Sequence, residues 1–397
     1  MSNWAGVIRK RLEGDKVIWM VTLILSVWSL LSVYGSISSL AYKAGGNFWK
    51  FLTKQGILLL AGFALIYIVH RINYKYFARL ATFVYVVAVV ALILTLLVGP
   101  EINDAKRWLE IPFVGLTLQT SDLAKVALVM WVAKELHFRH EALGSKMNSF
   151  DFISNFLPII AGIGLVCGLI MPADLSTALL LGSVCMGMLL VGGLHWQYIL
   201  TVSGIVITMA MLFLSMILYA PSMFSRGETW RNRILGHTEM SISGEELVTS
   251  NGDYQIELAQ IAIYNGGLLP SGPGSGVSRN FLPHPYSDMI YAFIIEEWGA
   301  IIGGLGLLLM YLILLYRTII TAKICGRPFG STLAMGLGLM ITIQALINMA
   351  VSVRLFPTTG QPLPLVSFGG TSILFTCLSI GVILSVSRSP LINSKKR

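Results

Sequence analysis

Asp288 is the acidic residue of this chain whose position most clearly suggests a role in chemistry. It ends a polar loop and stands at the mouth of a long apolar run that also contains Glu296 and Glu297. Ionisable groups in a membrane segment are costly and point to function. The Asp288 carboxylate could act as a general base that takes a proton from an attacking hydroxyl. It could also cap the helix that follows, because Asp is favoured at helix starts, and the two roles can coexist.

Glu296 and Glu297 lie about two helical turns beyond Asp288. At about 100° per residue, Glu296 is about 80° from the Asp288 face and Glu297 is nearly opposite. The two glutamates therefore cannot both line one cavity with Asp288. We expect one of them to bond a neighbouring helix or Lys125, and Glu296 is the next candidate for a role toward the substrate.

Lys106 and Arg107 lie between two apolar runs and are followed by Trp108. Lysine and arginine at such a place could bind phosphate oxygens, and arginine could do so in bidentate fashion. Alternatively, these residues anchor the chain at the membrane interface, where tryptophan is enriched.

Three further cations are candidates for substrate binding. Lys125 lies near the start of an apolar run, where it needs a partner or a water-filled pocket unless it reaches the headgroups. Arg231 and Arg233 lie in a long polar loop, where they could instead form a solvated surface. Basic groups around an acidic residue indicate an anionic, lipid-linked substrate handled at the outer leaflet, but they do not distinguish a transferase from a transporter.

The composition predicts an integral membrane protein. Of 397 residues, 55% are hydrophobic and 12% are charged, whereas soluble proteins carry roughly 25% charged residues. The net charge of +9 is spread in small clusters near the ends of apolar runs, which favours lipid headgroups or an anionic substrate over nucleic acid. The four cysteines are scattered without a CxxC pair, so no metal cluster or disulfide framework is visible.

A spanning helix needs about 20 mainly apolar residues. The sequence has ten such runs, at approximately 17–40, 55–70, 77–98, 121–137, 152–171, 175–193, 196–220, 289–316, 330–352 and 370–387. Lys and Arg are more frequent in the segments that share a side with both termini, which predicts cytoplasmic termini. The fold class is thus an all-α polytopic membrane protein, with residues 1–397 as a single membrane domain.

Three segments between the runs are unusual. The large loop 221–287 is predicted to be extracytoplasmic and contains an amphipathic stretch, 254–263, which we expect to form a short helix on the outer surface. Segments 99–120 and 353–369 are too apolar for free loops and too rich in Pro and Gly for spans. We expect them to be re-entrant, which is tolerated only against protein or a water-filled cavity.

Several motifs occur in one order along almost the whole chain. They are Asp104–Trp108, Gln119–Lys125, Asn251–Gln255, Ala262–Gly267, Leu282–Ala292, Glu296–Gly299 and Pro357–Ser372. In these motifs the chain resembles the SEDS family (shape, elongation, division and sporulation), which includes FtsW, RodA and SpoVE. The stretches 280–288 and 355–364 look more like FtsW, the division member. The chain departs from the family pattern at Pro172, at Thr120 in place of proline, and at Asp122 in place of glutamate.

The resemblance implies a peptidoglycan glycosyltransferase that polymerises lipid II at the outer face of the bacterial cytoplasmic membrane during cell division. It implies that Asp288 is the catalytic residue. It also implies partners: a class B penicillin-binding transpeptidase and other division proteins. A divalent cation could share the task of stabilising the diphosphate, although no ligand cluster is evident. Two alternatives remain open, a lipid II flippase and a non-catalytic division scaffold.

Overall fold

The protein is helical and has several helices suited to a membrane. The computed structural model describes residues 13–43, 48–102, 105–111, 116–144, 146, 148–221, 227–231, 251–278 and 288–394. Within these ranges, eight helices are long and apolar enough to cross a membrane. Many large hydrophobic side chains on them are exposed, above all on α10 (Trp196–Tyr219). Exposed apolar faces of this length suit lipid rather than water, which confirms a multi-pass membrane protein.

All ten predicted apolar runs coincide with helical segments. Two of them differ from the eight clear spans. Helix α9 (Leu175–Val191) has 17 residues, and α5 (Thr120–Phe138) is interrupted by charged residues. The run predicted at 289–316 is not one α-helix. It consists of α13 (Ile290–Trp298), a π-helix and α14.

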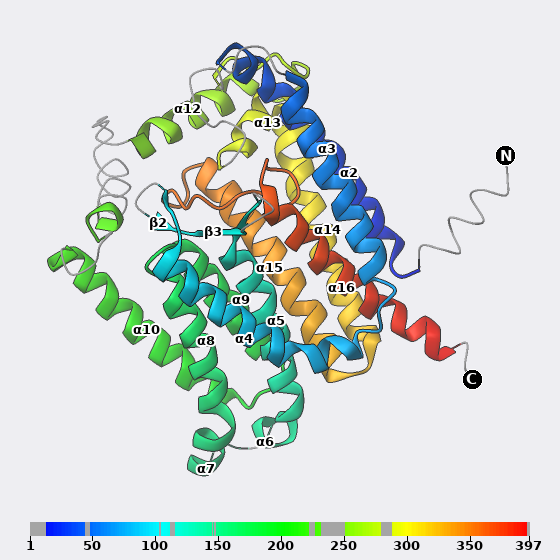
Figure 1. The fold of residues 1–397 in the computed structure, drawn as a ribbon, viewed down its shortest axis with the longest axis vertical. Coiled ribbons are helices and arrows are strands. Elements are labelled where there is room, and N and C mark those ends of the chain that lie inside the picture. Colours follow the sequence, from blue (N-terminus) through cyan, green and yellow to red (C-terminus); the bar gives the residue numbers. More distant parts are fainter. Residues whose placement is uncertain are drawn as a thin grey trace. The chain divides into compact units, whose positions relative to one another are not determined.

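The described residues form two compact units. The first unit holds those within 1–73, 245–325 and 341–397. Its elements are α2 (Lys16–Lys43), α3 (Phe48–Val69), α12 (Asn251–Gly266), α13, η4 (Gly299–Leu305), α14 (Gly306–Cys325), the second part of α15 (Pro328–Ser352) and α16 (Gly370–Ser394). Helices α2, α3, α14 and α16 pack against one another (Figure 1). The prediction of a single domain stays a prediction.

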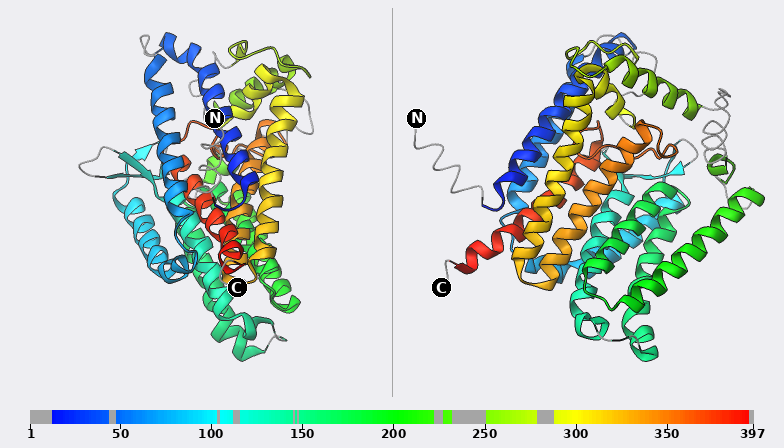
Figure 2. Two further views of the ribbon diagram at one scale, coloured as in Figure 1. Left: turned by 90° about the vertical axis from the view of Figure 1, so that its right-hand side faces the viewer. Right: turned by 180° about the vertical axis from the view of Figure 1, so that it is seen from behind.

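The second unit holds the described residues within 74–244 and 326–340. Its helices are α4 (Lys75–Val98), α5, α6 (His140–Gly144), α7 (Ser149–Asp151), η1 (Phe152–Phe156), α8 (Leu157–Ile170), α9, α10 and the first part of α15. Helices α4, α5, α8 and α9 form its packed centre (Figure 2). Pro172 follows the end of α8, and Asp174 caps α9 by accepting a bond from the Thr177 amide at 3.1 Å, as the turn chemistry predicts.

Segment 99–120 contains four short strands, which the all-α prediction missed. Strands β1 (Glu101–Ile102) and β2 (Ala105–Lys106) form one antiparallel pair, and β3 (Trp108–Ile111) and β4 (Leu116–Gln119) form another. The alternation of apolar and polar residues in β4 is the signal for a strand. In the second pair, Leu109 faces Leu118, so apolar residues stand opposite each other in the ladder.

The predicted amphipathic helix in the large loop exists as α12, but it does not simply lie on an outer surface. Leu258, Ala259 and Ala262 are buried against Met289, which precedes α13, Phe293 of α13 and Val351 of α15. The small side chains of Ala259 and Ala262 let α12 approach α13 closely. Of the rest of loop 221–287, residues 222–226, 232–250 and 279–287 lie outside the described ranges.

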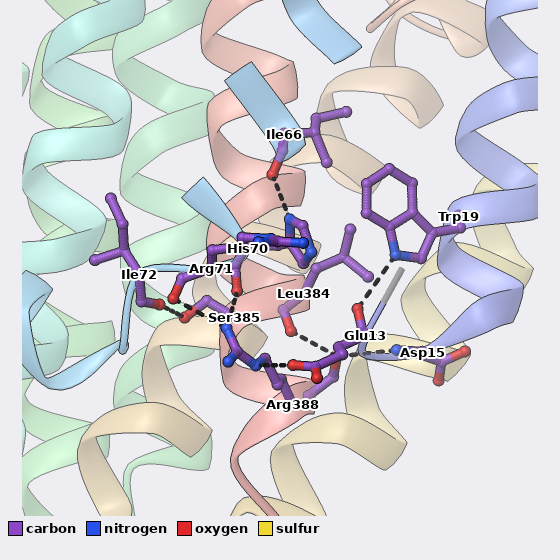
Figure 3. Close-up of polar contacts among 11 residues, drawn as sticks. Glu13, Asp15, Trp19, Ile66, His70, Arg71, Ile72, Leu384, Ser385 and Arg388 are labelled. Atoms are coloured by element: carbon purple, nitrogen blue, oxygen red, sulfur yellow. Dashed lines mark hydrogen bonds and ion pairs between the residues drawn. The ribbon is translucent and has the colours of Figure 1, made fainter. Parts of the chain in front are cut away.

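The ends of three segments in the first unit are tied together by polar contacts (Figure 3). Arg388 of α16 forms an ion pair with Glu13 and donates a 2.9 Å hydrogen bond to the main-chain oxygen of Arg71. Ser385, one turn earlier, donates to the main-chain oxygen of Ile72 at 2.5 Å. These contacts fix α16 against the segment that leaves α3 and the segment that enters α2.

Candidate active site

Asp288 lies half-buried at the approach to α13. The helix begins at Ile290, and Met289 occupies the position before it. Asp288 thus stands two positions before the first helical residue, and its role as a helix cap stays a prediction. Asp288 stands just outside the regular helix, and the role of general base expected for its carboxylate stays a prediction.

The main chain at Asp288 is held by Asn348 of α15. The Asn348 Nδ2 atom lies 2.7 Å from the carbonyl oxygen of Asp288 and 2.7 Å from that of Gln361. Asn348 is buried, at 1% exposure. The Asn348 side chain thus connects Asp288, just before α13, with Gln361 of segment 353–369.

Segment 353–369 has no regular secondary structure, yet part of it lies in the interior. Leu363, Leu365, Val366 and Ser367 are buried. Leu365 has a φ of 67°, in the left-handed region that side chains other than glycine rarely adopt. The Ser367 hydroxyl accepts a 2.8 Å bond from the Leu363 amide. Irregular backbone supported in this way by protein fits the expected re-entrant segment.

Both glutamates of α13 bind the glycine-rich segment that follows α12. One oxygen of Glu296 accepts bonds from the amides of Val277 and Ser278, both at 3.0 Å, and from the Ser278 hydroxyl at 2.9 Å. Glu297 accepts from the Gly274 amide at 3.1 Å. We expected one of the glutamates to bond a neighbouring helix or Lys125, whereas these bonds go to groups of this loop. A direct role of Glu296 toward substrate stays a prediction.

Arg107 belongs to the second unit and binds the turn between α8 and α9. Its Nε atom donates to the Ala173 carbonyl at 2.9 Å, and its Nη1 atom lies 3.6 Å from Asp174 Oδ2. Lys106 and Arg107 line a small cavity of about 20 Å³ with Thr120 and other residues. Such a space holds about one water molecule.

Lys125 is buried beside Asp122. Its Nζ atom lies 2.7 Å from Asp122 Oδ1, and the two side chains are 6% and 4% exposed. The expected partner for a lysine inside an apolar run is therefore present one turn earlier on the same helix. The snorkelling alternative is wrong, because the ammonium group is enclosed by protein.

Of the two candidate arginines of the large loop, Arg231 lies within the described residues. Arg231 is exposed at the end of a short helical stretch, 227–231, whose Trp230 ring packs against Phe213 at 5.8 Å. Arg233 lies outside the described residues. Within the described part of the chain, no group of three or more His, Cys, Asp or Glu side chains could hold a metal ion.

Sequence reasoning missed Asn348 and Gln344 as contributors to this region. Gln344 donates to the Pro362 carbonyl at 2.9 Å, one turn before Asn348. The available signal was a pair of amides at positions i and i+4 inside an apolar run, which places two polar groups on one helix face.

Comparison with known proteins identifies the family to which this chain belongs. The helices define a polytopic membrane protein with an acidic residue at the approach to a spanning segment. The chain belongs to the FtsW/RodA/SpoVE family, described as cell cycle protein, whose model matches residues 15–391. This match confirms the resemblance found in the motifs.

Individual relatives cover almost the whole chain. Proteins from Geobacter metallireducens and Halomonas elongata, both named "Probable peptidoglycan glycosyltransferase FtsW", are 31% and 28% identical. The alignments cover 94% of this chain in each case, and 94% and 90% of the relatives.

Two solved structures share the fold. A chain from a peptidoglycan synthase complex that coordinates polymerization and crosslinking has a TM-score of 0.70 and 24% identity, covering 95% of this chain and 98% of its own. The rod shape determining protein RodA of Thermus thermophilus has a TM-score of 0.65 and 22% identity, covering 95% and 97%.

Proposed function

We propose that this protein is a peptidoglycan glycosyltransferase that polymerises lipid II into glycan strands during cell division. The observation that carries the proposal is the family match over residues 15–391, together with relatives of 31% identity that bear the name of this activity. The position of Asp288, half-buried before α13 and braced by Asn348, supports it.

In the proposed reaction, Asp288 accepts the proton of the acceptor sugar hydroxyl. The hydroxyl oxygen forms a bond to the anomeric carbon of the donor sugar, and the bond from that carbon to the lipid diphosphate breaks. The diphosphate leaves with the bonding electron pair, and its charge needs cations in a water-poor site. Lys106 is our first candidate for that contact, because Arg107 is engaged with Asp174. Arg231 and Arg233 are further candidates.

The test is polymerisation of purified lipid II by the purified protein, comparing wild type with Asp288→Asn. Asparagine keeps the size of the side chain but cannot take the proton, so we expect glycan synthesis to fall by about 10²–10⁴-fold. Glu141→Gln, which removes an exposed carboxylate from α6, serves as the control and should stay active. Unchanged synthesis by Asp288→Asn would remove Asp288 from the mechanism and leave Glu296 as the next candidate.

The same variant separates the alternative functions. A flippase with Asp288→Asn would continue to move lipid II across vesicle membranes, since no bond is made at Asp288. A non-catalytic scaffold with this substitution would continue to support division. Loss of polymerisation with normal expression and thermal stability is the result expected of a transferase.

For partners, we propose a single-span class B penicillin-binding transpeptidase, other division proteins and membrane lipid. The support is the fold shared with a chain of a peptidoglycan synthase complex that coordinates polymerization and crosslinking. The protein purified from its native membrane should carry such a transpeptidase, and adding the transpeptidase should change the polymerisation rate. Purification without it and an unaltered rate would contradict the proposal.

For localisation, we propose the bacterial cytoplasmic membrane, with both termini in the cytoplasm and loop 221–287 outside. The asymmetry of Lys and Arg between the two sides supports this orientation. A cysteine placed at Ser243, which lies outside the described residues, should react with a membrane-impermeant reagent in intact cells. The wild-type protein controls for reaction of its four native cysteines, and protection at position 243 would overturn the orientation.

A further inference from the structure

Asn348 uses its two amide hydrogens on two carbonyl groups from different parts of the chain. Asp288 precedes Asn348 by 60 positions and Gln361 follows it by 13. Both partners are carbonyl oxygens, so only the nitrogen of the amide can face them. The Asn348 Oδ1 atom is buried and accepts no hydrogen bond from the described residues, so the two donated bonds are what this side chain contributes.

The Gln361 end of this bridge is firmly held. Gln344 bonds the Pro362 carbonyl at 2.9 Å, and the Tyr311 hydroxyl bonds the Pro364 carbonyl at 2.5 Å. Asn348 itself is buried in α15, where Ser352 donates to its main-chain oxygen at 2.9 Å. The donor that reaches Asp288 is therefore anchored on both sides.

The Asp288 end lies where regular helix bonding has not yet begun. The first helical residue is Ile290, and the Ala292 amide bonds the Met289 carbonyl. A hydrogen bond to the Asp288 carbonyl fixes the peptide plane between Asp288 and Met289. That plane limits the direction in which the Asp288 side chain leaves the main chain.

We propose that Asn348 is a positioning residue for the reaction, acting through Asp288. It holds the main chain at Asp288 so that the carboxylate stays aimed at the acceptor hydroxyl. This inference rests on the proposed function, in which Asp288 is the base. A misplacement of about 1 Å at a reacting group can cost about 10²-fold in rate, so one fixed peptide plane has a measurable effect.

The first test compares Asn348→Ala with Gln344→Ala in lipid II polymerisation. Gln344→Ala is the matched control, because the bond that it removes goes to the Pro362 carbonyl of the same segment, one turn away, and not to the Asp288 carbonyl. We expect Asn348→Ala to lower kcat by about 10- to 100-fold with little change in KM, and Gln344→Ala to lower kcat much less. Equal losses in both variants would overturn the proposal, since both would then reflect the segment as a whole.

A double-variant cycle shows whether Asn348 acts through Asp288. If it does, adding Asn348→Ala to Asp288→Asn should cost little more activity than Asp288→Asn alone, because the base is already gone. Independent structural damage would instead multiply the two losses. Asn348→Asp, which has the same shape but places a carboxylate against two carbonyl oxygens, should behave like Asn348→Ala, and a fully active Asn348→Asp would contradict the proposal.

A measurement that needs no activity separates this inference from the proposed function. Hydrogen exchange of the full-length protein in detergent should speed up at 288–295 and at 361–367 in Asn348→Ala, but only at 361–367 in Gln344→Ala. Unchanged exchange at 288–295 in Asn348→Ala would overturn the positioning role. If exchange follows this pattern while the wild-type protein makes no glycan, the bracing of Asp288 is correct and the proposed transferase function is wrong.

Discussion

Arg317 and Asp15, 302 positions apart, form a close ion pair between α14 and the residue before α2. The Nε and Nη2 atoms of Arg317 lie 2.8 and 2.6 Å from the same oxygen, Oδ2, of Asp15. The other oxygen accepts the Val17 amide at 2.8 Å, and the Asp15 amide donates to Ser387 at 3.0 Å. Asp15 thus connects α2, α14 and α16 of the first unit.

Replacing Arg317 by Met should destabilise the protein, because the Asp15 side chain is only 7% exposed and would lose its counter-ion. We expect a loss of about 1–3 kcal/mol, since Arg317 itself is partly solvated. The measurement is the thermal midpoint in detergent. Lys323→Met, which removes an exposed cation from the same helix, is the control, and an equal loss in both would contradict a specific role for the pair.

The buried pair of Lys125 and Asp122 gives a second prediction. Lys125→Met should destabilise the fold by about 3–5 kcal/mol, because it leaves a carboxylate buried without its counter-ion. The double variant Lys125→Met with Asp122→Asn should recover much of this loss. If the recovered protein still binds lipid II poorly, Lys125 also serves the substrate. Recovery of both stability and activity would limit Lys125 to the fold.

Lys106 and Arg107 should respond differently to substitution. Arg107→Lys loses the fork that joins Ala173 and Asp174, so the thermal midpoint should fall. Lys106→Met should leave the midpoint near that of the wild type and raise the KM for lipid II if Lys106 contacts the diphosphate. An unchanged KM for Lys106→Met would exclude that contact.

Glu296 allows a test of charge against hydrogen bonding. The variant Glu296→Gln keeps a carbonyl oxygen that can accept from the amides of Val277 and Ser278, so it should retain most activity. Glu296→Ala leaves these donors without an acceptor and should lose stability by about 1–3 kcal/mol, together with activity. The thermal midpoint and the polymerisation rate of both variants are the measurements. If Glu296→Gln is as inactive as Glu296→Ala while remaining stable, the negative charge itself is needed and Glu296 acts on the substrate.

The positions of the spanning helices could be predicted because length and hydropathy constrain them strongly. The amphipathic stretch at 254–263 predicted a helix for the same kind of reason, since its period is visible locally. Its burial against Met289 and Phe293 was not predictable, because the sequence does not say which surface an apolar face meets. The strands within segment 99–120 were not predicted, because the apolar composition of this segment fits a re-entrant segment equally well.

The polar contacts of the site were the least predictable part. Asn348 bonds the main chain of Asp288, and Arg107 bonds the carbonyl of Ala173, 66 positions away. Such pairs could not be predicted, because they depend on how the helices pack. Asp288 was singled out because a carboxylate at the mouth of a span is unusual by itself. Glu296 was singled out for the same reason, although its described bonds go to groups of the glycine-rich segment.

The π-helix η4 has a consequence for how this chain tolerates changes of length. A π-helix closes its turns with i→i+5 bonds, and η4 joins α13 to α14, beginning at Gly299, whose φ is 71°. Removing one residue from it would turn α13 by about 100° relative to α14. Asp288 would then rotate away from Asn348 although no contacting side chain had changed. The number of residues between Gly299 and Gly306 thus sets the rotation of α13 about its axis relative to α14. A single deletion there should lower activity more severely than most substitutions.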